Sequence, residues 1–137
     1  MRADREPFES QDPYESPSRS GRAPVLNEVK LDTLIAGDGD FLDALIDEIL
    51  FTVGTQIERI EHAMSQGRPT DLRLAGEVLR MAGETVGAPR FTEAARTVAA
   101  LGKSGVMGGA MDALTHLRAE FERMTAALRE YAERHAG

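Results

Sequence analysis

One stretch of the sequence, residues 70–86, places charged and apolar side chains in a pattern suited to recognition. Its apolar residues recur at spacings of three and four, which predicts a helix with one buried stripe. These residues are Leu72, Ala75, Leu79, Ala82 and Val86. At about 100° per residue, Glu77 falls roughly opposite that stripe. A carboxylate therefore lies at the centre of the outward side of this helix.

The outward side of this helix combines charge with exposed apolar groups. Arg73 precedes Glu77 by four residues and Arg80 follows it by three, while Leu74 and Met81 lie on the shoulder. Clustered exposed apolar side chains often mark protein interfaces. The candidate docking residues are Arg73, Leu74, Glu77, Arg80, Met81 and Glu84.

The sequence contains no motif that indicates catalysis or metal binding. Helical bundles hold di-iron sites through Glu-x-x-His, but Arg or Ala precedes each histidine by three residues, and HExxH is absent as well. The histidines are His62, His116 and His135, and we interpret them as surface residues. The chain has no cysteine, no GxSxG and no GxxxxGK[ST]. We therefore predict no catalytic residue, no metal site and no cofactor, and a protein that is not an enzyme.

Length, charge and hydropathy exclude further classes of protein. The 137 residues favour one domain. A net charge of −7 argues against nucleic-acid binding, which needs a concentrated basic face. No uninterrupted apolar run reaches the length of a membrane span, and the first residues lack the apolar core of a signal peptide. We expect no membrane association and a cytoplasmic protein.

Residues 1–24 differ in composition from the rest. They hold four of the six prolines, several serines and nine charges of mixed sign. Such a segment buries too little apolar surface to offset its ordering entropy. We predict a disordered tail over 1–24 and a helical domain over 25–137.

From Val25 onward the periodicity is helical, and no alternating strand pattern appears. We expect helices over 25–36, from Asp40 as N-cap to about Gln66, over 69–86, over 89–101, and from about 110 to the C-terminal region, with a glycine-rich loop over 102–109. The predicted buried stripe of the second helix is Phe41, Leu45, Ile49, Val53, Ile57, Ile60 and Met64, widened by Leu42, Ile46 and Leu50. The predicted fold is an all-α, antiparallel four-helix bundle with a short N-terminal helix across it.

The stretch from Val25 to about Tyr131 resembles the histidine-containing phosphotransfer (HPt) domain. GDGDFLDALIDEIL resembles the loop and start of the family's long second helix, and AGEVLRMAGETVG over 75–87 resembles the family's AHxLKGxxxxxG signature. In this register Leu79 and Gly87 match, and Arg80 stands for the lysine. Glu77 takes the place of the phosphoaccepting histidine, and Met81 replaces the glycine one turn later.

The resemblance implies a place in phosphorelay signalling and a partner that is a response-regulator receiver domain or a histidine kinase. Glutamate cannot form the phosphoimidazole that carries the phosphoryl group, so the sequence predicts a pseudo-phosphotransfer protein. Glu77 then mimics phosphohistidine, contacts a receiver-bound Mg²⁺, or only forms ion pairs with Arg73 and Arg80. An acyl phosphate on Glu77 is a less favoured reading. The alternative function is a helical adaptor or oligomerisation module unrelated to phosphorelay.

Overall fold

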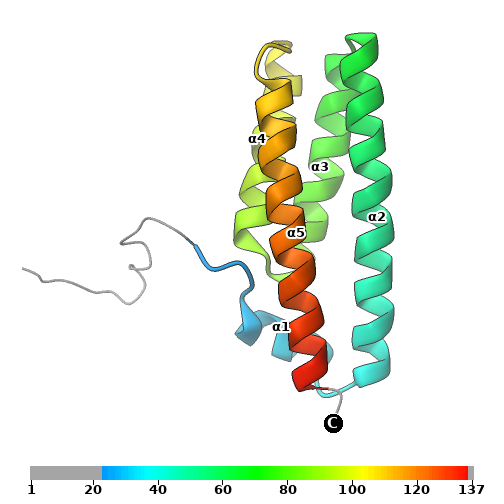
Figure 1. The fold of residues 1–137 in the computed structure, drawn as a ribbon, viewed down its shortest axis with the longest axis vertical. Helices are drawn as coiled ribbons and strands as arrows, with labels where there is room; N and C mark the ends of the chain where they lie inside the picture. The colour runs from blue at the N-terminus through cyan, green and yellow to red at the C-terminus, as the bar shows by residue number, and fades with distance from the viewer. Residues whose placement is uncertain (1–22, 136–137) are drawn as a thin grey trace, which may run out of the picture.

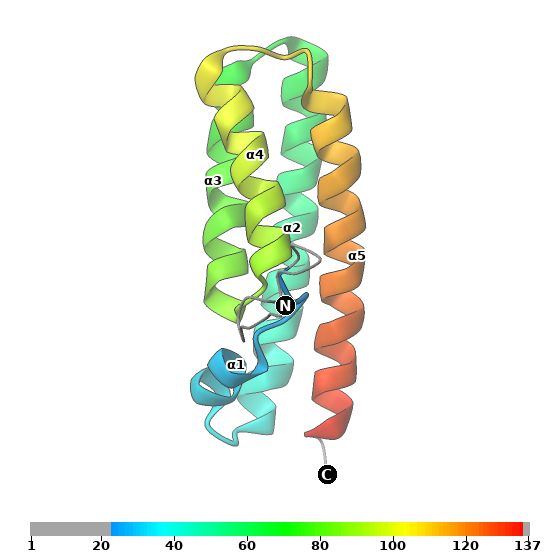
Figure 2. The same cartoon turned by 90° about the vertical axis from the view of Figure 1, so that its left-hand side faces the viewer.

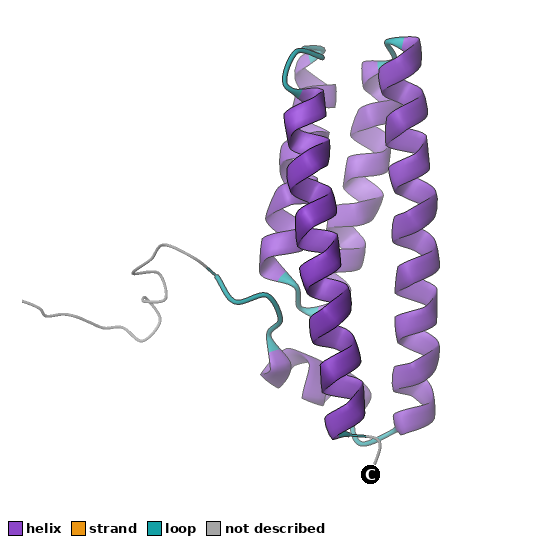
Figure 3. Cartoon of the chain, viewed as in Figure 1, coloured by secondary structure: helices purple, strands orange, loops and turns teal. Residues whose placement is uncertain are grey.

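The computed structural model describes residues 23–135, which fold into helices without a strand among them (Figures 1 and 3). The helices are α1 (Glu28–Ile35), α2 (Gly39–Gln66), α3 (Pro69–Val86), α4 (Pro89–Ser104) and α5 (Ala110–Arg134). The four long helices run up, down, up and down, and α1 lies across one end of the bundle (Figures 1 and 2). The predicted all-α architecture is confirmed.

The predicted tail lies almost entirely outside the described residues, which begin at Ala23. Ala23 and Pro24 are exposed and precede the first helix. Within residues 23–135, no helix is long and apolar enough to cross a membrane.

Local chemistry sets the helix boundaries. Asp38, rather than the predicted Asp40, is the N-cap of α2, because its carboxylate accepts a hydrogen bond of 3.0 Å from the amide of Phe41. Asp40 lies in the first turn instead, where its charge suits the helix dipole. Gly87 ends α3 as predicted, with a left-handed φ of 76°.

The buried stripe of α2 differs from the prediction at its first two turns. Leu42 and Ile46 are buried, whereas Phe41 is 42% exposed and Leu45 is half-buried. The reason is that α2 is ten residues longer than α3 (28 against 18), so its lower part packs against α1 and α5 (Figure 2). From Ile49 onward the predicted stripe is buried, apart from Met64, which is half-buried.

The first helix and the fourth also have corrected bounds. α1 covers only Glu28–Ile35 of the predicted 25–36, and α4 continues to Ser104 rather than ending at Leu101. Gly102, predicted to open a loop, is instead buried in α4 against the first turn of α3. A Cβ at Gly102 would lie 2.6 Å from the carbonyl oxygen of Pro69, so this approach of the two helices requires a glycine.

Candidate docking site

Helix α3 has three different sides. One side is buried in the core through Leu72, Ala75, Leu79 and Val86, as predicted, although Ala82 is only half-buried. A second side faces α4. The third side faces solvent and carries the six predicted docking residues, all of which are half-buried or exposed.

The side of α3 that faces α4 is built on glycine. A Cβ at Gly76 would lie 2.6 Å from the backbone nitrogen of Ala99 on α4, and a Cβ at Gly83 would meet Thr92 and lie 3.0 Å from the ring of Phe91. Real Cβ atoms do not approach other atoms this closely, so α3 and α4 lie nearer to each other than larger residues would permit. This close approach brings side chains of α4 beside the outward side of α3.

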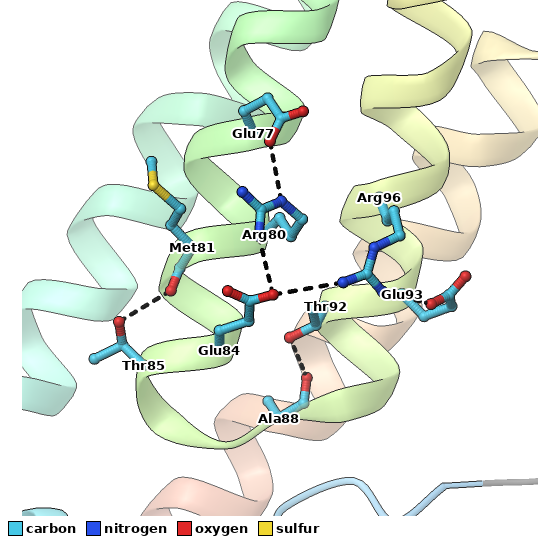
Figure 4. A network of polar contacts seen from close by, with 9 residues as sticks. All are labelled: Glu77, Arg80, Met81, Glu84, Thr85, Ala88, Thr92, Glu93 and Arg96. Carbon is cyan, nitrogen blue, oxygen red and sulfur yellow. Dashed lines mark hydrogen bonds and ion pairs between the residues drawn. The ribbon is translucent and has the colours of Figure 1, made fainter.

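Alternating charges join the two helices in a chain of ion pairs, which we call the charge ladder: Glu77, Arg80, Glu84, Arg96 and Glu93 (Figure 4). Arg80 Nε donates to Glu77 Oε1 at 3.0 Å, and Arg80 Nη1 donates to Glu84 Oε2 at 2.9 Å. The same Glu84 oxygen accepts from Arg96 Nη2 of α4 at 3.4 Å. Arg96 also donates to Glu93 at 2.8 Å.

The ladder fixes which charges remain open to a partner. Arg80 is held between two carboxylates, and its hydrogen bond to Glu77, followed by that to Glu84, raises its pKa above the ordinary value. Glu77 uses one oxygen for Arg80, and its side chain is 41% exposed. The expected ion pair between Glu77 and Arg80 is therefore present, whereas the expected pair between Glu77 and Arg73 is not formed in the described part of the chain. Among residues 23–135, Arg73 forms no ion pair, so its guanidinium is open to a partner.

The apolar shoulder of the site is exposed. Leu74 and Met81 are 50% and 51% exposed, so neither is covered by α1. Leu74 also borders a groove of about 460 Å³ between α2 and α3, whose other walls include Gln56, Arg59 and Val78. The outward side of α3 thus offers an apolar strip toward α2 and the charge ladder toward α4.

Sequence reasoning missed Arg96 and Glu93, the two ladder residues on α4. A spacing of three along one helix permits an ion pair between them, but no sequence pattern indicates which side of α4 lies beside Glu84. It also missed a buried carboxylate on α5. Glu120 is 2% exposed and accepts hydrogen bonds of 2.9 Å from both Arg90 and Arg123.

A metal-binding cluster is not found within residues 23–135. No group of three or more histidine, aspartate or glutamate side chains there could hold a metal ion. His62, His116 and His135 are exposed, as predicted, and none belongs to the charge ladder.

Comparison with known proteins gives a structural likeness. No protein-family model matches the chain, and no curated protein matches it significantly. The crystal structure of histidine-containing phosphotransfer protein B (HptB) from Pseudomonas aeruginosa PAO1 superposes with a TM-score of 0.76. The match covers 82% of this chain and 98% of the HptB chain at 17% sequence identity. The chain therefore has the fold of a histidine-containing phosphotransfer protein.

Proposed function

We propose that this chain is a pseudo-phosphotransfer protein of two-component signalling. In this proposal it binds a response-regulator receiver domain or a histidine kinase through the outward side of α3. Glu77 is the centre of the contact, and the protein accepts no phosphate. It acts as a binding partner rather than as an enzyme.

The observation that carries this proposal is the place of Glu77. It lies on an exposed side of α3 in an HPt-like bundle, between the apolar strip of Leu74 and Met81 and the charge ladder. Both parts of this surface are accessible, and exposed apolar groups beside ordered charge are typical of specific docking. The HptB likeness supports the fold in this proposal, and the Glu77 surface supports the binding role.

The chemistry of Glu77 favours binding over phosphotransfer. A carboxylate has one negative charge, whereas a phosphoryl group has nearly two, and Arg80 already offsets part of the Glu77 charge. We therefore propose that Glu77 acts as an acceptor of hydrogen bonds or as a hard oxygen ligand toward a partner's Mg²⁺. Its second carboxylate oxygen, Oε2, forms no bond within the ladder and would be the acceptor or ligand atom.

An NMR titration tests the proposed function. The ¹⁵N-labelled full chain is titrated with the receiver domains of its source organism, with and without Mg²⁺ and the phosphoryl mimic beryllofluoride. We expect amide shifts centred on Arg73, Glu77, Arg80 and Met81. The absence of shifts on this side of α3 with every receiver and kinase would contradict the proposal.

Replacing the apolar strip separates the proposal from its alternative. Leu74→Asp with Met81→Asp should abolish receiver binding, while Val106→Asp with Met111→Asp is a matched control on exposed apolar residues elsewhere (56% and 61%). A helical oligomerisation module would instead lose self-association with the first pair. Light scattering after size-exclusion chromatography measures that outcome.

A further inference from the structure

A second groove adjoins the charge ladder. It has a volume of about 580 Å³ and lies where the segment before α1, the α3–α4 turn and α5 meet. Its walls include Glu84 and Arg96 of the ladder, Lys30 of α1 and His116 of α5. Any occupant of this groove therefore touches the edge of the proposed docking site.

The groove presents polar groups without partners. Glu120 contributes to its wall, and although the side chain is 2% exposed, its Oε1 has no hydrogen-bond partner among the described residues. A buried carboxylate oxygen left without a donor is costly, so a donor from an occupant would stabilise it. Within the described part of the chain, Lys30 forms no ion pair. The groove thus suits an occupant with both donors and carboxylates, such as a polar peptide.

The N-terminal segment of this chain is such a peptide, and it is joined to the described residues at the edge of the groove. Ala23, the first described residue, forms part of the wall, and residues 1–22 precede it. The amide of Asn27 donates to the carbonyl oxygen of Gly87 at 2.6 Å, which anchors the segment before α1 to the α3–α4 turn (Figure 2). A tethered segment acts at an effective concentration on the order of millimolar, so it needs little intrinsic affinity.

Individual ion pairs, rather than a net charge of the groove, select the part of this segment that binds. Arg22 adjoins Ala23 in the sequence, and the three residue steps from Arg22 to Arg19 can span at most about 10 Å. The charged residues of the groove wall balance, with Glu84, Glu93 and Glu120 against Lys30, Arg90 and Arg96. Two of these carboxylates, Glu84 and Glu93, already bind Arg96 and are the acceptors nearest the ladder. We propose that the groove binds residues 15–22 of this chain, with Arg19 and Arg22 competing with Arg96 for Glu84 and Glu93.

This contact would regulate the docking site, a consequence that rests on the proposed function. Glu84 links Arg80 to Arg96 in the ladder. When an arginine of the N-terminal segment takes its carboxylate, the segment lies over the α4 edge of the site and obstructs a partner there. Weakening the contact should then raise the affinity for a receiver that binds, by about threefold to tenfold at millimolar effective concentration.

A spin label tests the contact itself without any partner. The chain has no cysteine, so Ser16→Cys provides a single labelling position in the full-length protein. We expect the nitroxide to broaden the amide signals of Glu84, Glu93 and Arg96. Adding Arg19→Glu and Arg22→Glu should remove at least half of this broadening, and so should high salt, which screens the ion pairs.

The matched control changes the same charge elsewhere in the segment. Arg2→Glu with Arg5→Glu alters the net charge equally and should leave the broadening unchanged. Equal broadening in the two double variants, or none at Glu84 and Arg96 in the parent, would overturn the inference. Because no receiver is present, that failure leaves the proposed function standing. Broadening without any effect on receiver affinity would overturn only the regulatory consequence.

Discussion

The molecule contains two networks of glutamate and arginine with opposite physical settings. The charge ladder on α3 and α4 lies at the surface, where the Glu84 and Arg96 side chains are 45% and 51% exposed (Figure 4). The network of Arg90, Glu120 and Arg123 is centred on a carboxylate that is 2% exposed. Similar ion-pair distances in the two networks therefore have very different energetic consequences.

This difference in burial means that the two networks contribute unequally to the stability of the fold. Exposed ion pairs contribute about 0–1 kcal/mol, because water and salt screen them. A buried charge that loses its partner costs several kcal/mol. Single ladder residues can thus be replaced without unfolding the bundle, which is what the proposed docking role requires of them. The buried network has no comparable freedom, because α4 and α5 are joined through it.

Glu120→Gln should produce the largest loss of stability. It leaves Arg90, whose side chain is 18% exposed, without its carboxylate, and we expect the free energy of unfolding to fall by about 2–4 kcal/mol. Urea denaturation followed by circular dichroism measures this change. Glu93→Gln, in the exposed ladder, is the control and should cost less than about 0.5 kcal/mol. Equal losses in the two variants would erase the distinction between the networks.

Gly76→Ala tests whether the ladder depends on the helix packing beneath it. The new Cβ would lie 2.6 Å from the backbone nitrogen of Ala99, so α4 must move away from α3. We expect a loss of about 1–3 kcal/mol, together with weaker coupling between Glu84 and Arg96. Gly54→Ala is the control, because a Cβ there meets nothing within 4 Å. Gly54→Ala should stabilise α2 by about 0.5–1 kcal/mol.

A third polar contact lies between these extremes and responds to pH. Tyr131, which is 1% exposed, donates a hydrogen bond of 2.5 Å to Asp32 and so joins α5 to α1. Burial, followed by this bond, raises the pKa of Tyr131 to about 12, against about 10 for an unfolded tyrosine. The folded state thus holds the proton more tightly. Its stabilising contribution is complete below about pH 10 and is lost as the pH rises to about 12.

Tyr131→Phe isolates this contribution. The variant should be less stable than the parent at pH 8, and the difference should shrink between about pH 10 and 12. Urea denaturation at several pH values measures the difference directly. A difference that stays constant over this range would mean that the hydroxyl titrates normally in the folded protein.

These contacts show which features of the structure could be predicted from the sequence. Periodicity predicted the helices, and helical geometry placed Glu77, Leu74 and Met81 outward, because both depend on neighbours along one helix. The ladder contact between Glu84 and Arg96 and the bond between Arg90 and Glu120 join residues 12 and 30 positions apart, so only the packed bundle defines them. Likewise, Gly76 and Gly102 are explained by the approach of α3 to α4, which local propensity does not report.

Glu77→Gln should have the smallest effect on stability and, in the proposed function, a large effect on binding. Its partner Arg80 retains Glu84, and the Glu77 side chain is 41% exposed, so the free energy of unfolding should change by less than about 0.5 kcal/mol. In the proposed function the same change removes the negative charge at the centre of the contact. Receiver binding in the presence of Mg²⁺ should therefore weaken by about tenfold or more, measured by calorimetry.

Arg73→Gln provides the matched control for that experiment. It removes a cation one turn before Glu77 that forms no ion pair within residues 23–135, again with little effect on stability. If Glu77 approaches a partner's metal ion, its loss should make binding independent of Mg²⁺, whereas the loss of Arg73 should weaken binding equally with and without the ion. If both variants bind as the parent does while Leu74→Asp does not, the apolar strip alone forms the contact. The charge of Glu77 would then have no part in recognition.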